Sequence, residues 1–285
     1  MSSCDNCPSK GKCGNKSGNC SRMMMKYGKV KNIIGVLSGK GGVGKSTITG
    51  ILAVKLRNKG YKVGVLDADI TGPSMPRFFG VNKERAYGAA TDEKDVYKIN
   101  PVETPLGIKV MSLNFLIEKE DQPVIWRGPV ITNMLQQMYT YTDWGELDFL
   151  LIDMPPGTGD IALTVMQSLP VNGMIIVSTP QDMVSMIVKK VITMCERLNV
   201  EVIGAVENMS YVKCPDCGRK IRLFGKTSPE EHAAYLGVPF ISEMPLNVEL
   251  AEAVESGNAE KYITENKEYE EIYEGFKSDY KMGFI

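Results

Sequence analysis

A glycine-rich stretch early in the chain reads Gly39-Lys40-Gly41-Gly42-Val43-Gly44-Lys45-Ser46-Thr47. It matches the phosphate-binding pattern G-x-x-x-x-G-K-[S/T] at every fixed position, between an apolar run over 33–38 and a helical pattern over 46–59. Glycines let successive backbone N–H groups turn toward an anion, and the helix N-terminus adds partial positive charge. Lys45 is expected to neutralise the β- and γ-phosphate oxygens of ATP, and the Ser46 hydroxyl to ligate Mg²⁺. The matching strand and helix disfavour the alternative, a glycine-rich turn in which Lys45 and Ser46 occur by chance.

Short apolar runs alternate with helical stretches along most of the chain. Strands are expected over 33–38, 63–67, 108–113, 149–153, 174–178 and 202–207, and helices over 46–59, 131–141, 160–168 and 183–198. Most of the strands are continuously apolar, which is typical of strands covered on both faces. The pattern predicts an α/β protein with a mainly parallel sheet and helices on both faces. The polar range 81–107 is expected to leave the sheet.

Composition divides the 285 residues into three zones: a cysteine-rich basic arm over 1–31, a P-loop domain over 32–265 and an amphipathic helical tail over 266–285. Hydrophobic and charged fractions of 43% and 24% are those of an ordinary globular protein. No apolar run is long enough to span a membrane and no secretory signal starts the chain, so a cytoplasmic location is expected. The arm has a net charge of +6 but no aromatic residue before Tyr27, which disfavours a nucleic-acid partner.

Two expected strands end in carboxylates. Asp153 closes the apolar run 149–153, the arrangement that holds Mg²⁺ beside a P-loop, and a glycine-hinged loop follows it. The run 63–67 ends in Asp67, and Asp69 lies two residues further on. An acid there is suited to orienting the attacking water or to touching the metal. Strand-end caps are the common role of such residues when no P-loop is present.

Lys40, at the second position of the loop, is not needed to bind phosphate. With it, the loop resembles the deviant Walker A class of dimeric ATPases, which includes MinD, ParA and the nitrogenase iron protein. Within that class the chain is similar to the Mrp-type iron–sulfur cluster carrier ATPases over about residues 30–255. The segments that carry the resemblance are Asp67-Ala68-Asp69-Ile70-Thr71-Gly72-Pro73-Ser74, Trp126-Arg127-Gly128-Pro129, Asp153-Met154-Pro155-Pro156-Gly157-Thr158-Gly159-Asp160, Glu207-Asn208-Met209-Ser210 and Cys214-Pro215-Asp216-Cys217-Gly218.

The resemblance implies a doubly wound P-loop NTPase sheet that works as a homodimer, and it assigns roles to residues by position. Lys40 would reach the nucleotide of the other subunit, and Asp69 would position water. Asp67 and Asp153 would lie on the metal side, and Asn208, expected at the end of a strand, would contact the adenine edge. The segment around Pro245 would wall the base.

Cys214 and Cys217 form a C-x2-C pair in a loop that contains Gly and Pro. One loop can present both thiolates to one metal centre, but zinc and iron–sulfur centres require four ligands. The same pair from each subunit of a two-fold dimer supplies four. The resemblance implies a bridging [4Fe–4S] cluster there. The alternative is a zinc site that borrows ligands elsewhere, for which His232 is the one imidazole in the chain.

The arm places four further cysteines in one segment, Cys4, Cys7, Cys13 and Cys20. Four thiolates so close together suit a complete [4Fe–4S] site, and the surrounding lysines would offset its negative charge. The spacing resembles the N-terminal motif of the eukaryotic cytosolic scaffold branch, although the usual ligand before the C-x2-C is absent. Tight zinc binding or thiol storage stays open. The seventh cysteine, Cys195, lies among apolar residues at helical spacing and is expected in the core.

The resemblance implies an ATP-dependent carrier that hydrolyses ATP slowly and passes a labile cluster to apo iron–sulfur proteins. One alternative is a MinD/ParA-like positioning protein that binds a membrane through a basic amphipathic C-terminus. Residues 267–285 instead carry three lysines and five acids, so the tail is expected to pack on protein. A second alternative is an ATP-dependent iron–sulfur reductase. Its ligand cysteines lie far apart in sequence, which favours the carrier here.

Overall fold

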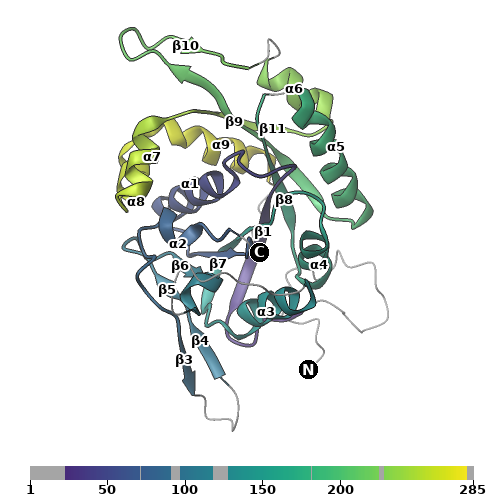
Figure 1. The fold of residues 1–285 in the computed structure, drawn as a ribbon, viewed down its shortest axis with the longest axis vertical. Coiled ribbons are helices and arrows are strands. Elements are labelled where there is room, and N and C mark those ends of the chain that lie inside the picture. Colours follow the sequence, from purple (N-terminus) through teal and green to yellow (C-terminus); the bar gives the residue numbers. More distant parts are fainter. Residues whose placement is uncertain are drawn as a thin grey trace.

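The computed structural model describes residues 23–70, 72–90, 97–117, 128–180, 182–224 and 228–280 (Figure 1). Its strands are β1 (Lys29–Ser38), β2 (Val63–Asp67), β3 (Tyr87–Ala90), β4 (Tyr97–Asn100), β5 (Val102–Glu103), β6 (Lys109–Met111), β7 (Glu146–Asp153), β8 (Gly173–Ser178), β9 (Glu201–Lys213), β10 (Lys220–Ile221) and β11 (Phe240–Pro245). Its helices are α1 (Lys45–Asn58), α2 (Met75–Phe78), α3 (Gly128–Tyr141), α4 (Asp160–Ser168), α5 (Asp182–Arg197), α6 (Pro229–Leu236), α7 (Val248–Glu255), α8 (Ala259–Glu265) and α9 (Glu270–Asp279). Two short 3-10 turns are η1 (Leu113–Phe115) and η2 (Lys267–Tyr269).

One nine-stranded sheet runs through the molecule in the order β10-β9-β8-β1-β7-β2-β6-β5, with β11 also paired to β9. The pairings of β1 with β7 and β8, of β2 with β6 and β7, and of β9 with β8 and β11 are parallel. Only the edge pairs β5–β6 and β9–β10 within this sheet are antiparallel. The predicted doubly wound, mainly parallel α/β fold is confirmed.

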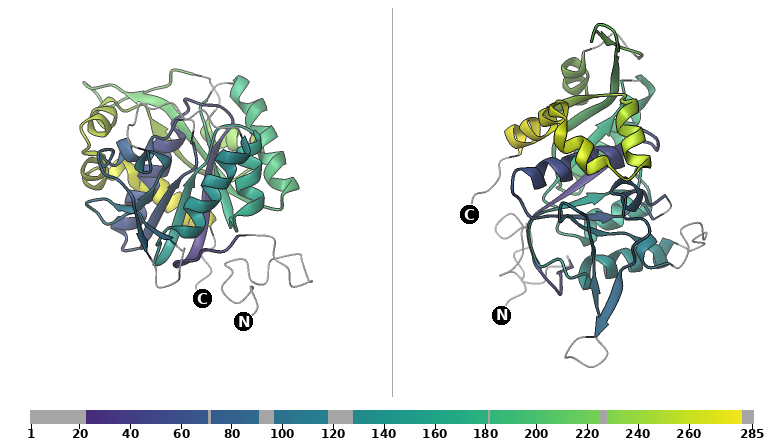
Figure 2. Two further views of the ribbon diagram at one scale, coloured as in Figure 1. Left: turned by 60° about the horizontal axis from the view of Figure 1, so that its bottom comes forward. Right: turned by 90° about the vertical axis from the view of Figure 1, so that its left-hand side faces the viewer.

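Alternate residues of the central strands enter two separate cores. Ile34 and Val36 of β1 pack into the core beneath α1, α7, α8 and α9, whereas Ile33 and Leu37 pack into the core beneath α3, α4 and α5. Figure 2 shows these two helical layers on opposite faces of the sheet. Since both faces are covered, the strands need apolar residues at every position, which explains their continuous apolar runs. Cys195 is fully buried in the second core, as expected, and burial raises the pKa of its thiol to about 12.

Three segments differ from the sequence prediction. Residues 81–107 do form a separate two-stranded sheet, β3–β4, but β5 within this range joins the edge of the main sheet. The strand expected over 202–207 continues to Lys213, because its outer half pairs with β10 and β11 instead of ending in a loop. Strand β11 was not predicted; it is short and Ser242 and Glu243 interrupt its apolar pattern.

Helix α9 packs against the sheet rather than standing apart. Its apolar stripe, Ile272, Tyr273 and Phe276, is buried in the core that also contains α1. Lys55 of α1 is fully buried, and its ammonium donates to the Asn266 carbonyl at 3.0 Å and to Glu270 at 3.2 Å. The acidic tail therefore packs on protein. Among the described residues, no helix combines the length and the apolar character that crossing a membrane requires.

Gly275 sets how closely α9 approaches β11. A Cβ added at this residue would lie 2.0 Å from the backbone oxygen of Ile241. We expect Gly275→Ala to lower the free energy of unfolding by about 1–3 kcal/mol, because the helix must move away from a backbone that cannot yield. Equilibrium urea unfolding followed by circular dichroism measures the change.

Gly88→Ala in β3 is the matched control, because a Cβ there meets nothing within 4 Å. It is expected to change stability by no more than about 0.5 kcal/mol. On an unpacked helix Gly→Ala stabilises by about 1 kcal/mol, so a gain in stability for Gly275→Ala would contradict the close packing of α9.

Candidate functional site

The glycine-rich loop connects the carboxyl end of β1 to the first turn of α1. Gly42 and Gly44 have φ angles of 81° and 80°, in the left-handed region that residues with a side chain rarely adopt. Gly44 is the N-cap residue of α1, and a Cβ there would lie 2.1 Å from the Asn208 amide nitrogen. These two positions require glycine for backbone conformation and for close approach, and the loop leaves Gly41 and Gly42 exposed at the helix N-terminus.

The buried carboxylate of Asp153, at the end of β7, connects to the first turn of α1. Lys45 Nζ lies 2.6 Å from Asp153 Oδ1, and Ser46 Oγ donates to Asp153 Oδ2 at 2.6 Å. Thr49 Oγ1 lies 3.2 Å from Asp153 Oδ1 and also donates to the Lys45 carbonyl at 3.0 Å. The sequence prediction included Lys45, Ser46 and Asp153 and missed Thr49. The spacing of four residues from Lys45, which places both on one face of a helix, was the available signal.

Asp67 and Asp153 are neighbours across the sheet. They are paired in the parallel register of β2 with β7, so both lie at the carboxyl edge beside the loop. Asp67 accepts hydrogen bonds from the backbone N–H of Met75 and from Ser112 Oγ, each at 3.2 Å. Burial, followed by the charge of Asp153, raises the pKa of Asp67 to about 8, and burial also raises the pKa of Asp153. Asp67 and Asp153 are thus two neighbouring buried acids, and Ser112 donates a hydrogen bond to the first of them. The sequence prediction did not include Ser112.

Asp69 and Lys40 lie at the more open side of this cluster. Asp69 Oδ2 is 3.7 Å from Lys45 Nζ, and its side chain keeps 15% of its accessible surface. Lys40 is exposed, while its carbonyl accepts a hydrogen bond from Ser38 Oγ at 2.9 Å. Asp69 therefore belongs to the same constellation as Lys45, and Lys40 faces solvent on the loop itself.

The loop after β7 contacts the end of β1, immediately before the glycine-rich loop. Gly157, with a φ of 80°, donates its backbone N–H to the Ser38 carbonyl at 2.7 Å. Asp160 then begins α4.

Asn208 contacts the glycine-rich loop, but it does not end a strand. Its side-chain amide donates to the Val43 carbonyl at 2.9 Å, and β9 continues past it to Lys213. Met209, the next residue, has a φ of 55°, a conformation that side chains rarely adopt. The expected strand end was therefore wrong, because pairing with β10 and β11 extends β9 beyond this unusual backbone position.

Cys214 and Cys217 lie in the turn between β9 and β10, in the projecting hairpin at the top of Figure 1. The Cys214 N–H donates to the Arg219 carbonyl, and the Gly218 N–H donates to the Cys214 carbonyl, each at 2.9 Å. The backbone N–H groups of Cys217 and Asp216 lower the pKa of the Cys214 thiol, because they stabilise its thiolate. Thiolates are the form that binds metals. The turn therefore presents two accessible thiols, and the thiol of Cys214 is shifted toward its metal-binding thiolate form.

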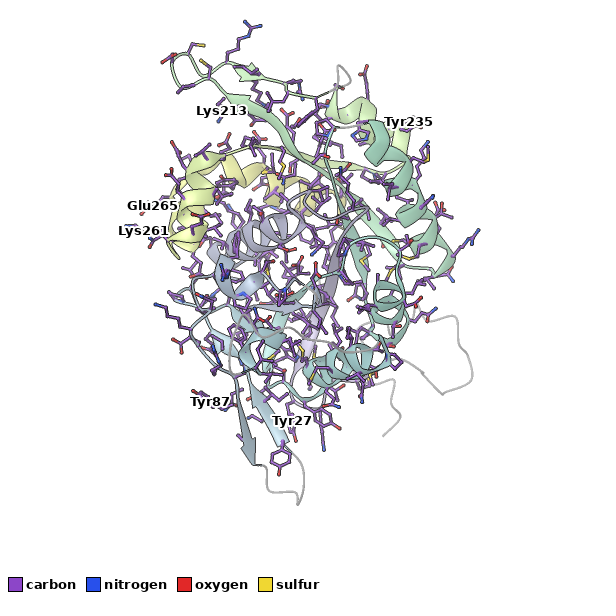
Figure 3. The ribbon with its side chains drawn as sticks, viewed as in Figure 1. Tyr27, Tyr87, Lys213, Tyr235, Lys261 and Glu265 are labelled. Carbon is purple, nitrogen blue, oxygen red and sulfur yellow. The ribbon has the colours of Figure 1, made fainter. Side chains whose placement is uncertain are left out.

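Salt bridges that the sequence did not indicate anchor the base of this hairpin. Glu243 of β11 pairs with Lys220 of β10 and, at 3.0 Å, with Arg222. Arg222 also donates to the buried Ser210 hydroxyl at 2.9 Å. Burial of Glu243 opposes its ionisation, but the hydrogen bond and charge of Lys220, with Arg222, hold its pKa below the ordinary value. In Figure 3, Lys213 marks where β9 leaves the body of the molecule.

His232, the alternative zinc ligand, is engaged elsewhere in the fold. His232 lies on α6, where its Nδ1 is 2.6 Å from Glu207 Oε2. Within the described part of the chain, no group of three or more His, Cys, Asp or Glu side chains is placed to hold a metal ion. The arm cysteines, Cys4, Cys7, Cys13 and Cys20, lie outside the described residues.

The oxygen groups of the nucleotide site suit Mg²⁺. Ser46 supplies a hydroxyl and Asp153 a carboxylate on one side of the loop, and Asp67 and Asp69 lie beside them. Hard oxygen ligands of this kind, together with phosphate oxygens, are what Mg²⁺ prefers. The loop's helix N-terminus and Lys45 supply the positive charge that phosphate requires.

Comparisons with known proteins agree with this geometry. A family model described as ParA, NUBPL iron-transfer P-loop NTPase, matches residues 29–279. A Clostridium perfringens protein named iron-sulfur cluster carrier protein is 60% identical over 283 residues, covering 96% of this chain and 99% of its own length. A protein of the same name from Methanocaldococcus jannaschii is 44% identical over 259 residues, covering 89% and 87%.

Solved structures add a nucleotide-bound relative. The Archaeoglobus fulgidus nucleotide-binding protein in complex with ADP has a TM-score of 0.73 and 44% identity, covering 86% of this chain and 92% of its own. MinD of Aquifex aeolicus in its MinC complex has a TM-score of 0.62 at 20% identity, covering 87% and 94%, and shares the fold alone. The chain belongs to the ParA-type NUBPL family of iron-transfer P-loop NTPases.

Proposed function

We propose that this protein binds and slowly hydrolyses ATP with Mg²⁺, carries a [4Fe–4S] cluster on Cys214 and Cys217, and passes the cluster to apo iron–sulfur proteins. The observation that carries the proposal is strand β9, which contacts the glycine-rich loop through Asn208 and continues directly into the thiol turn. One strand thereby connects a nucleotide site to a pair of metal-binding thiols. The relatives named iron-sulfur cluster carrier protein support the cargo.

The proposed ATP hydrolysis uses residues that already contact one another in the structure. Lys45 exchanges its partner Asp153 for the β- and γ-phosphate oxygens, while Ser46 and Asp153 hold Mg²⁺. Hydrolysis adds the oxygen of a water to the γ-phosphorus and breaks its bond to the β–γ bridging oxygen, leaving ADP and phosphate. Asp69 orients that water and Asp67 stays on the metal side. Lys40, exposed on the loop, reaches the nucleotide of a second subunit.

The proposed cluster site at Cys214 and Cys217 requires a second copy of the chain. The C-x2-C turn supplies two thiolates, and a [4Fe–4S] cluster requires four ligands. A two-fold axis at the hairpin brings the same pair from each subunit around one cluster. The cluster is cargo, so a site at the surface of two subunits, bound through exposed turns, suits its release. The four arm cysteines would hold a further cluster, with tight zinc binding or thiol storage as the alternatives.

Lys45→Ala tests the nucleotide site. We expect it to abolish ATP turnover, because it removes the ammonium that neutralises the transferred phosphate, while cluster loading on the isolated protein stays largely intact. Phosphate release and iron content measure the two effects. Lys83→Ala, which changes an exposed lysine in the turn after α2, is the control and should retain both. Unchanged turnover in Lys45→Ala would remove the P-loop assignment.

Cys214→Ala/Cys217→Ala tests the cluster site. After anaerobic reconstitution, we expect this variant to lose the iron and sulfide of the bridging cluster and to lose cluster-dependent dimerisation, measured by metal analysis and sedimentation. Cys4→Ala/Cys7→Ala should retain the iron and sulfide of the bridging cluster and the cluster-dependent dimer. Cys195→Ala controls for the removal of a thiol from the core. Zinc without sulfide at both cysteine sets would overturn the carrier proposal.

A further inference from the structure

The hairpin formed by β9 and β10 exposes a group of apolar side chains. Ile221, Leu223 and Phe224 are 46%, 51% and 39% exposed. Ile221 lies directly opposite Val212 in the antiparallel register, and residues paired in this way share one face of a sheet. Single exposed apolar residues are common on protein surfaces, whereas a group of them marks an interaction site.

The charged residues of the hairpin lie on its other face. Lys220 and Arg222 both pair with Glu243 of β11. Because side chains alternate between the two faces of a strand, the residues between and after these two cations lie on the opposite face. That face, here called the apolar hairpin face, consists of Val212, Ile221 and Leu223.

The cations beside the apolar hairpin face are compensated by acids of the same chain. Lys213, at the end of β9, pairs with Glu268, as Lys220 does with Glu243. Lys220 Nζ also lies 4.2 Å from the centre of the Tyr211 ring. Two hairpins of this kind can therefore approach each other with little repulsion between like charges.

Strand β10 lies at the edge of the sheet, where a second chain can approach it. In the sheet order it is the outermost strand, and among the described residues it pairs with β9 alone. Figure 1 shows the hairpin projecting from the body of the molecule. A projecting edge that carries an apolar face is typical of a site of association between chains.

The thiol pair selects the occupant of this face. Cys214 and Cys217 lie in the turn of the same hairpin, and the described part of the chain places no further ligand with them to complete a metal site. A second copy of the chain brings the two missing thiols and an identical apolar face. Around a two-fold axis such a face packs against itself, as in isologous interfaces.

We infer that the apolar hairpin face is the surface through which two copies of the chain associate around their thiol turns. The inference rests on the proposed function, because the shared cluster is what calls for a second copy at this place. It adds the protein contact that holds the two copies together. Since this contact involves no atom of the cluster, it acts in the apo protein as well, and the cluster strengthens the dimer.

Leu223→Glu in the full chain tests the inference. Sedimentation equilibrium before and after anaerobic reconstitution gives the dissociation constant of the dimer in each state. We expect the constant to rise about ten-fold or more in both states, because the substitution brings two carboxylates into an apolar contact. Circular dichroism should match that of the wild type, since Leu223 is half exposed.

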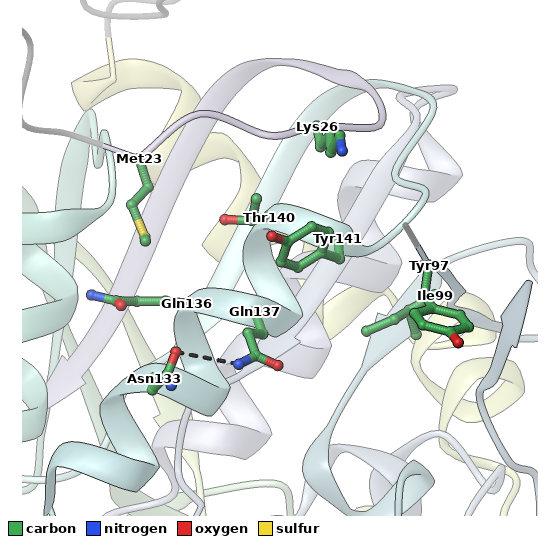
Figure 4. A pocket seen from close by; sticks show the side chains of 9 residues that line it. All are labelled: Met23, Lys26, Tyr97, Ile99, Asn133, Gln136, Gln137, Thr140 and Tyr141. Carbon is green, nitrogen blue, oxygen red and sulfur yellow. Dashed lines mark hydrogen bonds between the residues drawn. The ribbon is translucent and has the colours of Figure 1, made fainter. Parts of the chain in front are cut away.

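Tyr97→Glu is the matched control. It places the same charge on another exposed side chain of a strand, 66% exposed, in β4 at the opposite end of the molecule from the hairpin. Figure 4 shows Tyr97 at a pocket beside α3. This variant should dimerise as the wild type does.

A mixture of Leu223→Glu and Leu223→Lys chains tests whether the face packs against itself. Each variant alone is expected to associate weakly. The equimolar mixture is expected to associate more tightly than either, because opposite charges then meet across the two-fold axis. A mixture that associates no better than the separate variants would contradict self-packing.

Unchanged dimerisation of Leu223→Glu would overturn the inference, even if transfer of a cluster to an apo iron–sulfur protein slowed, since the face would then bind the recipient. Equal weakening by Tyr97→Glu would overturn it because only overall charge would matter, and so would a wild type that stays monomeric in both states. Wild-type protein that takes up no iron and sulfide would instead end the cluster proposal. The comparison of the apo proteins would then still decide the inference.

Discussion

The buried carboxylate of Asp153 is the constraint on which the site depends. It has no exposed surface, and removing a carboxylate from water is costly unless a counter-charge and hydrogen bonds compensate. Lys45, Ser46 and Thr49 supply them from the first turn of α1. The end of β7 and the start of α1 must therefore stay together, which fixes the glycine-rich loop between them. These groups, an ammonium, two hydroxyls and a carboxylate, are of the chemical kind that binds phosphate and Mg²⁺.

Strand β9 extends this constraint to the thiol hairpin. Asn208 holds it to the Val43 carbonyl, and beyond the left-handed backbone of Met209 the Tyr211 carbonyl accepts from the Leu246 N–H at 2.8 Å. Pairing with β11 and β10 then carries it to Lys213, immediately before Cys214. The unusual backbone of Met209 therefore lies between the contact with the glycine-rich loop and the turn that contains the two cysteines.

Local patterns predicted the parts of the site that depend on local geometry. The loop, the strand-end acids Asp67 and Asp153, and the C-x2-C turn are each set by a few consecutive residues, so the sequence located them. Thr49 shares a helical face with Lys45 and was within reach of the same reasoning. Ser112 and Glu243 could not be predicted in this way, because each bonds to a residue that lies far away in the sequence. Their partners follow only from the order of strands in the sheet. The helical stripe of α9 likewise predicted burial on protein but not its packing beside β11.

The anchoring of the hairpin separates the position of the thiol pair from its internal geometry. Glu243 fixes the base through Lys220 and Arg222, and Asn208 fixes the strand further down. The turn itself is held by its own backbone hydrogen bonds, from Cys214 to Arg219 and from Gly218 to Cys214. The hydrogen bonds within the turn therefore set the spacing of the two thiols, whereas the contacts of β9 and β10 set where the turn lies on the molecule. In the proposed dimer, two such turns would face one cluster, and each C-x2-C pair would keep the geometry that its own turn sets.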